Sequence, residues 1–173
     1  TGLHTLVDNI DEGDRISIIS FDDVVTIDAP FSDTLDRAKL HTAIDGLQPR
    51  GGTNIYEGLR QGFTMLGEYP ESVRQNRVIF LSDGLATVGD TSQANILALA
   101  RDWIRRGIGL TTIGVGNDFD VQLMRGLAEN GAGNYYFLED AAAAGEVFTE
   151  ELDFFMTPLA LDINIEAIAG SGW

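Results

Sequence analysis

Val78-Ile79-Phe80-Leu81-Ser82-Asp83-Gly84 is the stretch that decides the fold class of this chain. Its four leading apolar residues are typical of a strand buried on both faces, and the serine, aspartate and glycine are typical of a loop where such a strand ends. Residues 15–21 and 108–115 form two further apolar runs, and segments with helical spacing lie between the three runs. This alternation predicts an α/β fold with a doubly wound, mostly parallel sheet and helices on both faces.

Periodicity and helix caps place the remaining elements. We expect helices from the start of the chain to about residue 10, over 32–47 with Ser32 as the N-cap, from Thr53 or Asn54 to 66, and over 92–106, 119–130 and 141–155. Short strands are expected at 134–138 and, antiparallel at the edge of the sheet, at 24–27. Residues 1–156 are interpreted as one domain, and 157–173 as a linker or strand that begins another module.

The composition restricts both the partners and the chemistry. A net charge of −16 argues against nucleic acid or an anionic membrane surface as the main partner. The sequence contains no cysteine, which excludes disulfides, thiolate zinc sites and cysteine nucleophiles from these 173 residues. No apolar run approaches the roughly 20 residues that span a bilayer, so we expect no membrane insertion.

A candidate metal site is formed by the loop after Leu81 and by a second segment, Gly51-Gly52-Thr53-Asn54-Ile55. Both are expected at the carboxyl edge of the sheet, where an open α/β sheet places its ligand crevice. Thr53 offers a hydroxyl and Asp83 a carboxylate, which are hard oxygen donors suited to Mg²⁺, Mn²⁺ or Ca²⁺. The alternative interpretations are a helix cap for Thr53 and an Asp-Gly turn for Asp83. The supporting loop residues of the candidate site are Gly51, Gly52, Asn54, Ser82 and Gly84.

The order and spacing of five blocks resemble a von Willebrand factor type A domain. The blocks are residues 15–21, 51–55, 78–84, 110–116 and 134–137, and the resemblance extends over about residues 1–155. Its character is that of bacterial multi-domain proteins and of inter-alpha-trypsin inhibitor heavy chains. The resemblance implies a protein-binding module with a metal-ion-dependent adhesion site. In that site Thr53 would bind the cation directly, Asp83 would act through water, and an acidic residue of a protein partner would complete the coordination.

The sequence departs from this family at one point. The first part of the family's site, an Asp-x-Ser-x-Ser loop with its strand, is not among the 173 residues. The resemblance places that strand in the middle of the sheet, between 15–21 and 77–82. Three arrangements would give hydrogen-bond partners to the backbone at the two strand edges: an upstream segment, direct pairing of the two strands, or a strand from another chain. Residues 159–168 are a conceivable donor strand. With two ligands alone, these residues are expected to bind divalent metal weakly or not at all.

Two other functions remain open. The first is a structural domain of a larger secreted or envelope protein, without a working metal site. The second is a phosphotransfer enzyme that uses Asp83, although Ser82-Asp83-Gly84-Leu85 lacks the second aspartate of such sites and Lys39, the sole lysine, falls on a predicted helix. His4 and His41 are expected on exposed helical faces, and neither is assigned a catalytic role. We therefore expect a non-enzymatic protein, extracellular or in the cell envelope, with a cytoplasmic location as the alternative.

A further loop, around Asp118 and Asp120, has two interpretations. Its carboxylates are suited to loose calcium binding, and its position before a predicted helix is suited to capping. Capping is the interpretation that the spacing favours.

Overall fold

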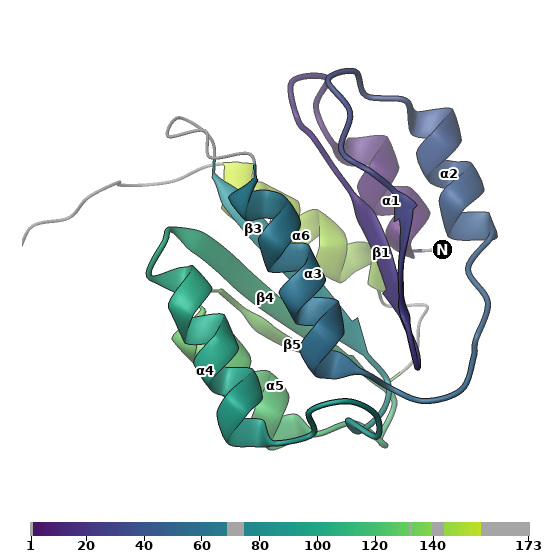
Figure 1. Cartoon of the computed structure of the whole chain (residues 1–173). Coiled ribbons are helices and arrows are strands. Elements are labelled where there is room, and N and C mark those ends of the chain that lie inside the picture. Colours follow the sequence, from purple (N-terminus) through teal and green to yellow (C-terminus); the bar gives the residue numbers. More distant parts are fainter. Residues whose placement is uncertain (1, 69–74, 132, 140–143, 157–173) are drawn as a thin grey trace, which may run out of the picture.

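The computed structural model describes residues 2–68, 75–131, 133–139 and 144–156 (Figure 1). Residues 157–173, with the strand expected at 159–168, lie outside the described residues. Along the chain the elements are α1 (Gly2–Asn9), β1 (Ile18–Phe21), β2 (Val25–Ala29), α2 (Arg37–Asp45), α3 (Ile55–Gly67), β3 (Asn76–Ser82), α4 (Gln93–Ile104), β4 (Ile108–Val115), α5 (Val121–Asn130), β5 (Tyr135–Leu138) and α6 (Ala144–Met156).

A parallel sheet of order β3-β4-β5 forms the centre of the molecule and confirms the α/β class. Strand β4 is its middle strand, and its side chains alternate between two helical layers. Leu110 packs in a core with the apolar faces of α3, α4 and α5. Ile113 packs in a second core with Leu6 of α1 and Phe148 of α6. The sheet therefore has helices on both faces, as the strand–helix alternation predicts.

The β1–β2 hairpin forms a separate antiparallel sheet and does not join β3. Direct pairing of β1 with β3 is therefore not seen in the part of the chain that the structure describes. Side chains hold the two sheets together instead: α3 packs against both strands, and Phe21 of β1 stacks on Phe80 of β3 with ring centroids 5.3 Å apart. All four residues of β1 are only half-buried, whereas β4 is buried over most of its length.

The start of the second helix differs from the sequence expectation. The second helix begins at Arg37 and not after Ser32, because the Ser32 hydroxyl accepts a hydrogen bond from Thr34 N at 3.3 Å and so closes a local turn. Asp36 is the N-cap, with its carboxylate accepting from Lys39 N at 3.1 Å. The third helix is capped by Asn54. No helix in the described ranges has the length and apolarity needed to cross a membrane.

Helix α6 is attached to the sheet through one buried carboxylate, that of Glu151. Asn134 Nδ2 and the Tyr136 hydroxyl each donate to Glu151 Oε2 at 3.0 Å, and the Thr111 hydroxyl donates to Oε1. Arg77 Nη1 lies 3.5 Å from Oε1 and supplies the opposite charge. A buried carboxylate is tolerated only when it is hydrogen-bonded and paired in this way. The network therefore fixes α6 over all three strands of the parallel sheet.

The network predicts an unusual titration of Tyr136. Burial, followed by the hydrogen bond to Glu151, raises the pKa of Tyr136 to about 12. Since the folded-state pKa lies above the usual value of about 10, its stabilising effect is complete below pH 10 and is lost as the pH rises towards 12. Absorbance titration near 295 nm, as the difference between the wild type and Tyr136→Phe, should show one phenol ionising only well above pH 10. A difference curve centred near pH 10 would contradict this.

The layer of α3 against α4 predicts a large cost for one core truncation. Phe63 is fully buried and stacks on Trp103, with ring centroids 6.0 Å apart. Phe63→Ala should lower the free energy of unfolding by about 3–5 kcal/mol, because it removes apolar contacts and leaves a cavity. Urea denaturation followed by circular dichroism would measure this. The control Val121→Ala, at a side chain on the surface, should change stability by less than about 0.5 kcal/mol.

Candidate functional site

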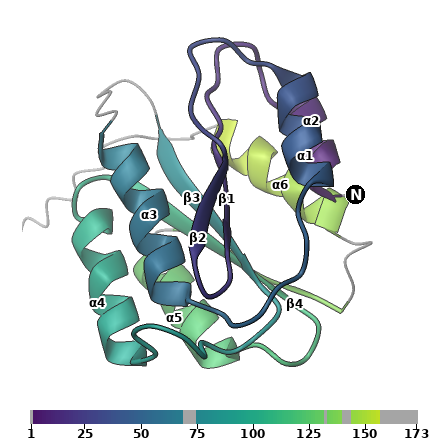
Figure 2. The ribbon, with the colours of Figure 1, turned by 45° about the vertical axis from the view of Figure 1, so that its right-hand side comes forward.

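Three loops meet at the carboxyl edge of β1 and β3. The turn 22–24 follows β1, the segment 50–54 leads into α3, and the loop 82–88 follows β3. Figure 2 shows the hairpin turn and the start of α3 at the same end of the molecule. Because β1 and β3 both end here, polar side chains distant in sequence are brought together.

Backbone hydrogen bonds fix Thr53 between the other two loops. Thr53 N donates to the Thr87 hydroxyl at 2.9 Å, and Thr87 N donates back to Thr53 O at 3.0 Å. On the other side, Asn54 N donates to Asp22 O at 2.9 Å. The Asn54 carboxamide also accepts from Glu57 N at 3.2 Å and caps α3. The cap is thus Asn54, so the Thr53 side chain is not needed for that role.

The Thr53 hydroxyl and the Asp83 carboxylate are the two groups of the site left without a protein partner. Within the described ranges, neither side chain takes part in a hydrogen bond or an ion pair. Thr53 Oγ1 lies 3.5 Å from the position that a Cβ on Gly84 would occupy. Asp83 precedes that glycine and is exposed. One hydroxyl and one carboxylate are therefore available to a group from outside these loops.

The glycine pair is required by contacts with neighbouring loops. A Cβ on Gly51 would lie 2.5 Å from the Asp23 carboxylate, and one on Gly52 would overlap Val88 and Asp23. Gly52 N donates to Asp23 Oδ1 at 3.0 Å. The absence of side chains at this pair therefore lets the backbone approach Asp23 closely. Across the site, Gly89 (φ +70°) lies so near the Asn54 carboxamide that a side chain there would collide with it.

Ser82 shapes the loop that carries Asp83. It is the last residue of β3 and is buried. Its hydroxyl donates to Gly84 O at 3.0 Å, and Gly84 N lies 3.4 Å from the same oxygen. Ser82 is therefore engaged inside its own loop, and Asp83 is turned outward beside it.

Asp22, Asp23 and Thr87 hold the site together and were not assigned a role from the sequence. Asp22 Oδ2 lies 3.4 Å from Arg50 Nε, and its other oxygen accepts from Val24 N at 2.9 Å. The Asp-Asp pair directly after a strand was the available signal, but its contacts run to a segment about 30 residues away. Sequence spacing does not define such contacts.

The donor set suits a hard cation but is small. No group of three histidine, cysteine, aspartate or glutamate side chains able to hold a metal ion occurs in the described parts of the chain. Mg²⁺ favours six oxygen ligands and Ca²⁺ six to eight. The oxygen atoms of Thr53 and Asp83 have the right chemistry and would supply a minority of those ligands.

The Asp118–Asp120 loop behaves as a helix cap. Asp120 Oδ1 accepts from Leu123 N at 2.9 Å at the start of α5, and its other oxygen accepts from Gln93 Nε2. The Asp120 carboxylate is therefore engaged by protein donors. This agrees with capping, the interpretation that the sequence spacing favours.

Comparison with known proteins gives similar proteins over nearly the whole chain. The model of the von Willebrand factor type A domain matches residues 2–150. The uncharacterized protein YfbK of Escherichia coli is 26% identical over 100% of this chain and 30% of its own length. Human inter-alpha-trypsin inhibitor heavy chain H2 is 29% identical over 94% of this chain and 18% of its own. The chain thus spans less than a third of the length of either curated relative.

A solved structure has a fold similar to that of this chain. The proximal thread matrix protein 1 of the mussel byssus, with a zinc-occupied MIDAS motif, is similar with a TM-score of 0.68 at 23% identity. That match covers 86% of this chain and 37% of the mussel chain. The family model covers most of the residues from α1 to α6, and the sheet order and helical layers are those described above. The chain belongs to the von Willebrand factor type A family.

Proposed function

We propose that this domain is a protein-binding module, for adhesion or assembly, that uses a metal-ion-dependent adhesion site containing Thr53 and Asp83. One observation carries the proposal: these two oxygen donors make no protein hydrogen bond in the described residues, while the polar groups around them hold the loops. The cation would be Mg²⁺, with Mn²⁺ or Ca²⁺ as substitutes, because the donors are hard oxygens.

The partner would present an acidic residue to this cation. The chain has a net charge of −16, and Asp22, Asp23 and Asp83 all lie at this edge. An acidic partner would be repelled by that field unless a divalent cation stood between the two. The metal would therefore decide whether binding occurs, which is the property of an adhesion switch and requires no chemical turnover.

Within the described residues, β1 and β3 each have one edge without a partner strand, and these edges support a further ligand source. A strand between them would hydrogen-bond to both sheets, and a loop at its carboxyl end would reach the edge that holds Thr53 and Asp83. An upstream strand ending in Asp-x-Ser-x-Ser would thereby supply the missing oxygen ligands. Insertion of a strand from a second copy is the competing arrangement, and it would make the protein self-associate.

Metal titration tests the assignment. Isothermal titration calorimetry of the 173-residue chain with MgCl₂ should give no micromolar binding, since two side-chain ligands are too few. A longer stretch of the natural polypeptide that carries an Asp-x-Ser-x-Ser segment should bind Mg²⁺. In that longer protein, Thr53→Ala and Asp83→Ala should each weaken binding by on the order of 10–100-fold.

The matched control is Asp118→Asn, which removes an exposed carboxylate from the loop before α5. It should leave the affinity for Mg²⁺ within about twofold, as expected for a charge outside the coordination sphere. If Asp118→Asn and Asp83→Ala lowered the affinity for Mg²⁺ equally, the loss would be an effect of net charge, and the assignment of Asp83 as a ligand would be wrong. Micromolar affinity in the 173-residue chain would show that its own residues complete the site.

A structural domain without a working metal site remains the second candidate function. Its support is the small donor set, and it requires that the longer protein also fail to bind Mg²⁺. An enzyme that transfers phosphate through Asp83 is not favoured, because the neighbours of Asp83 are Ser82 and Gly84, not a second carboxylate. An extracellular or cell-envelope location fits an adhesion role and is part of the proposal.

A further inference from the structure

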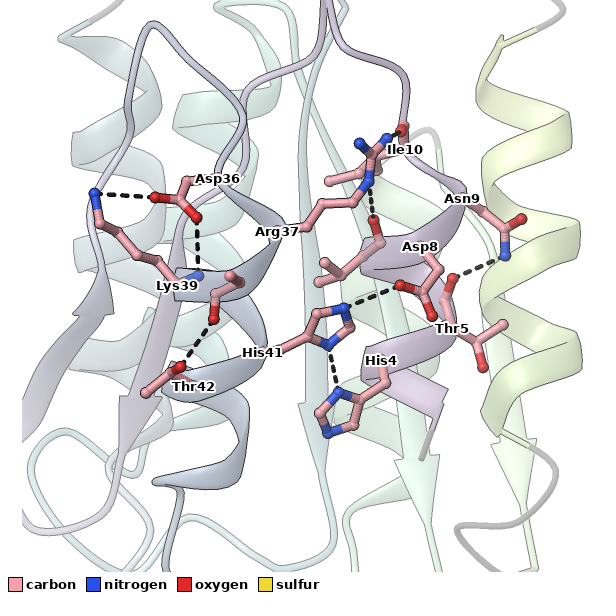
Figure 3. Close-up of polar contacts among 12 residues, drawn as sticks. His4, Thr5, Asp8, Asn9, Ile10, Asp36, Arg37, Lys39, His41 and Thr42 are labelled. Carbon is pink, nitrogen blue, oxygen red and sulfur yellow. Dashed lines mark hydrogen bonds and ion pairs between the residues drawn. The ribbon is translucent and has the colours of Figure 1, made fainter.

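Helices α1 and α2 carry the same pair of side chains at the same spacing. His4 and Asp8 lie four residues apart on α1, and His41 and Asp45 lie four residues apart on α2. Residues four apart share one face of a helix. The helices pack against each other through a common apolar core, so the two pairs are brought together. Figure 3 shows the rings of His4 and His41 between the helices, with a dashed line joining one nitrogen of each ring.

The four side chains form one continuous line of polar contacts. His41 Nε2 lies 2.9 Å from Asp8 Oδ1, and His4 Nε2 lies 3.1 Å from Asp45 Oδ1. Between them, the two Nδ1 atoms are 2.5 Å apart. The ring planes are within 10° of parallel, and the ring centroids are 4.8 Å apart. The distance between the centroids exceeds the distance between the two Nδ1 atoms by about the width of one imidazole ring. The two Nδ1 atoms therefore point at each other edge to edge, along the line of the ring centres.

Counting protons along this line gives the charge of the pair. Ionised carboxylates only accept hydrogen bonds, so each Nε2 carries a proton and donates to its aspartate. In a neutral histidine of that form, Nδ1 holds a lone pair, and two lone pairs would then repel at 2.5 Å. One additional proton between the Nδ1 atoms turns this repulsion into a hydrogen bond. This arrangement would place one imidazole and one imidazolium between two carboxylates.

We propose that His4 and His41 form a proton-dependent contact between α1 and α2, closed when the pair holds one shared proton. Loss of that proton leaves two opposed lone pairs. Gain of a second proton opposes two N–H groups and two positive charges. Histidine is the side chain that most often changes charge in the physiological pH range, so pH is the variable that opens or closes this contact. The contact is therefore strongest in an intermediate pH range and weaker on either side of it.

The surroundings leave the two aspartates as the charged partners of the pair. Among the described residues, Asp8 of α1 and Asp45 of α2 are the ionisable groups that contact the histidine pair. The cations of α2 are engaged elsewhere: Arg37 donates to main-chain carbonyls at the end of α1, and Lys39 pairs with Asp36. Helix α6 and strand β2 meet α1 and α2 through apolar side chains.

The two side chains are only 27% and 29% exposed, which corrects the expectation of freely exposed histidines. Partial burial strengthens the effect of a shared proton, because less water is present to replace the lost hydrogen bond. Helix α1 also packs its Leu6 against Phe148 of α6.

Nuclear magnetic resonance of the histidine rings tests the shared proton. The chain contains two histidines, so ¹⁵N-histidine labelling gives spectra that His4→Gln and His41→Gln assign directly. In the wild type, in the presence of EDTA, both Nε2 should remain protonated between pH 5 and 8, and the two rings should take up protons in two separate steps. Each single variant should show one protonation step. Two rings that titrate independently in the wild type, as they do in the variants, would overturn the proposal.

Denaturation at several pH values tests its effect on the fold. The difference in the free energy of unfolding between wild type and His41→Gln should be greatest between the two steps and should shrink at pH 9 and at pH 4.5. Lys39→Gln is the matched control, since it removes a positive charge from α2 without touching the pair. A constant difference in the free energy of unfolding between the wild type and His41→Gln across this pH range would contradict a shared proton. The same pH dependence in Lys39→Gln would also contradict it.

Discussion

The packing of α3 across two separate sheets is the constraint on which the rest of the structure depends. Hydrogen bonds do not join β1 to β3 in the described residues, so the apolar face of α3 and the Phe21–Phe80 contact hold the hairpin against the parallel sheet. The same helix begins at the carboxyl edge of both sheets. Its first turn is therefore placed beside the loop that carries Asp83, and the core and the candidate site share one supporting element.

The two polar networks of this molecule lie where polar groups are brought together by packing. Glu151 is stabilised because Arg77, Thr111 and Tyr136 surround it from three strands. The histidine pair forms because two helices share an apolar seam. In both cases the polar groups are close in space but far apart in the sequence. Burial makes such a contact sensitive to the protonation or loss of one partner.

Local signals in the sequence predicted a large part of the fold. The run 108–115 was long, apolar and β-branched, and it forms β4 with those bounds. The helix expected over 92–106 forms α4, and the Ser92 side chain caps it by accepting from Asn95 N. Ser32 was expected to cap the second helix, but its hydroxyl closes a turn with Thr34, and Asp36 caps the helix instead. A local pattern thus identified the helix but not which of two polar residues starts it.

The fold class, the apolar strands and the family resemblance followed from the order of residues, because periodicity and turn chemistry act over a few positions. Tertiary structure alone decided that β1 and β3 stay apart, that Asp23 and Thr87 hold the Thr53 loop, and that His4 meets His41. These contacts join segments about 30 to 40 residues apart, and their geometry depends on how whole helices and sheets pack. A linear sequence shows which side chains are present, and packing selects which of them meet.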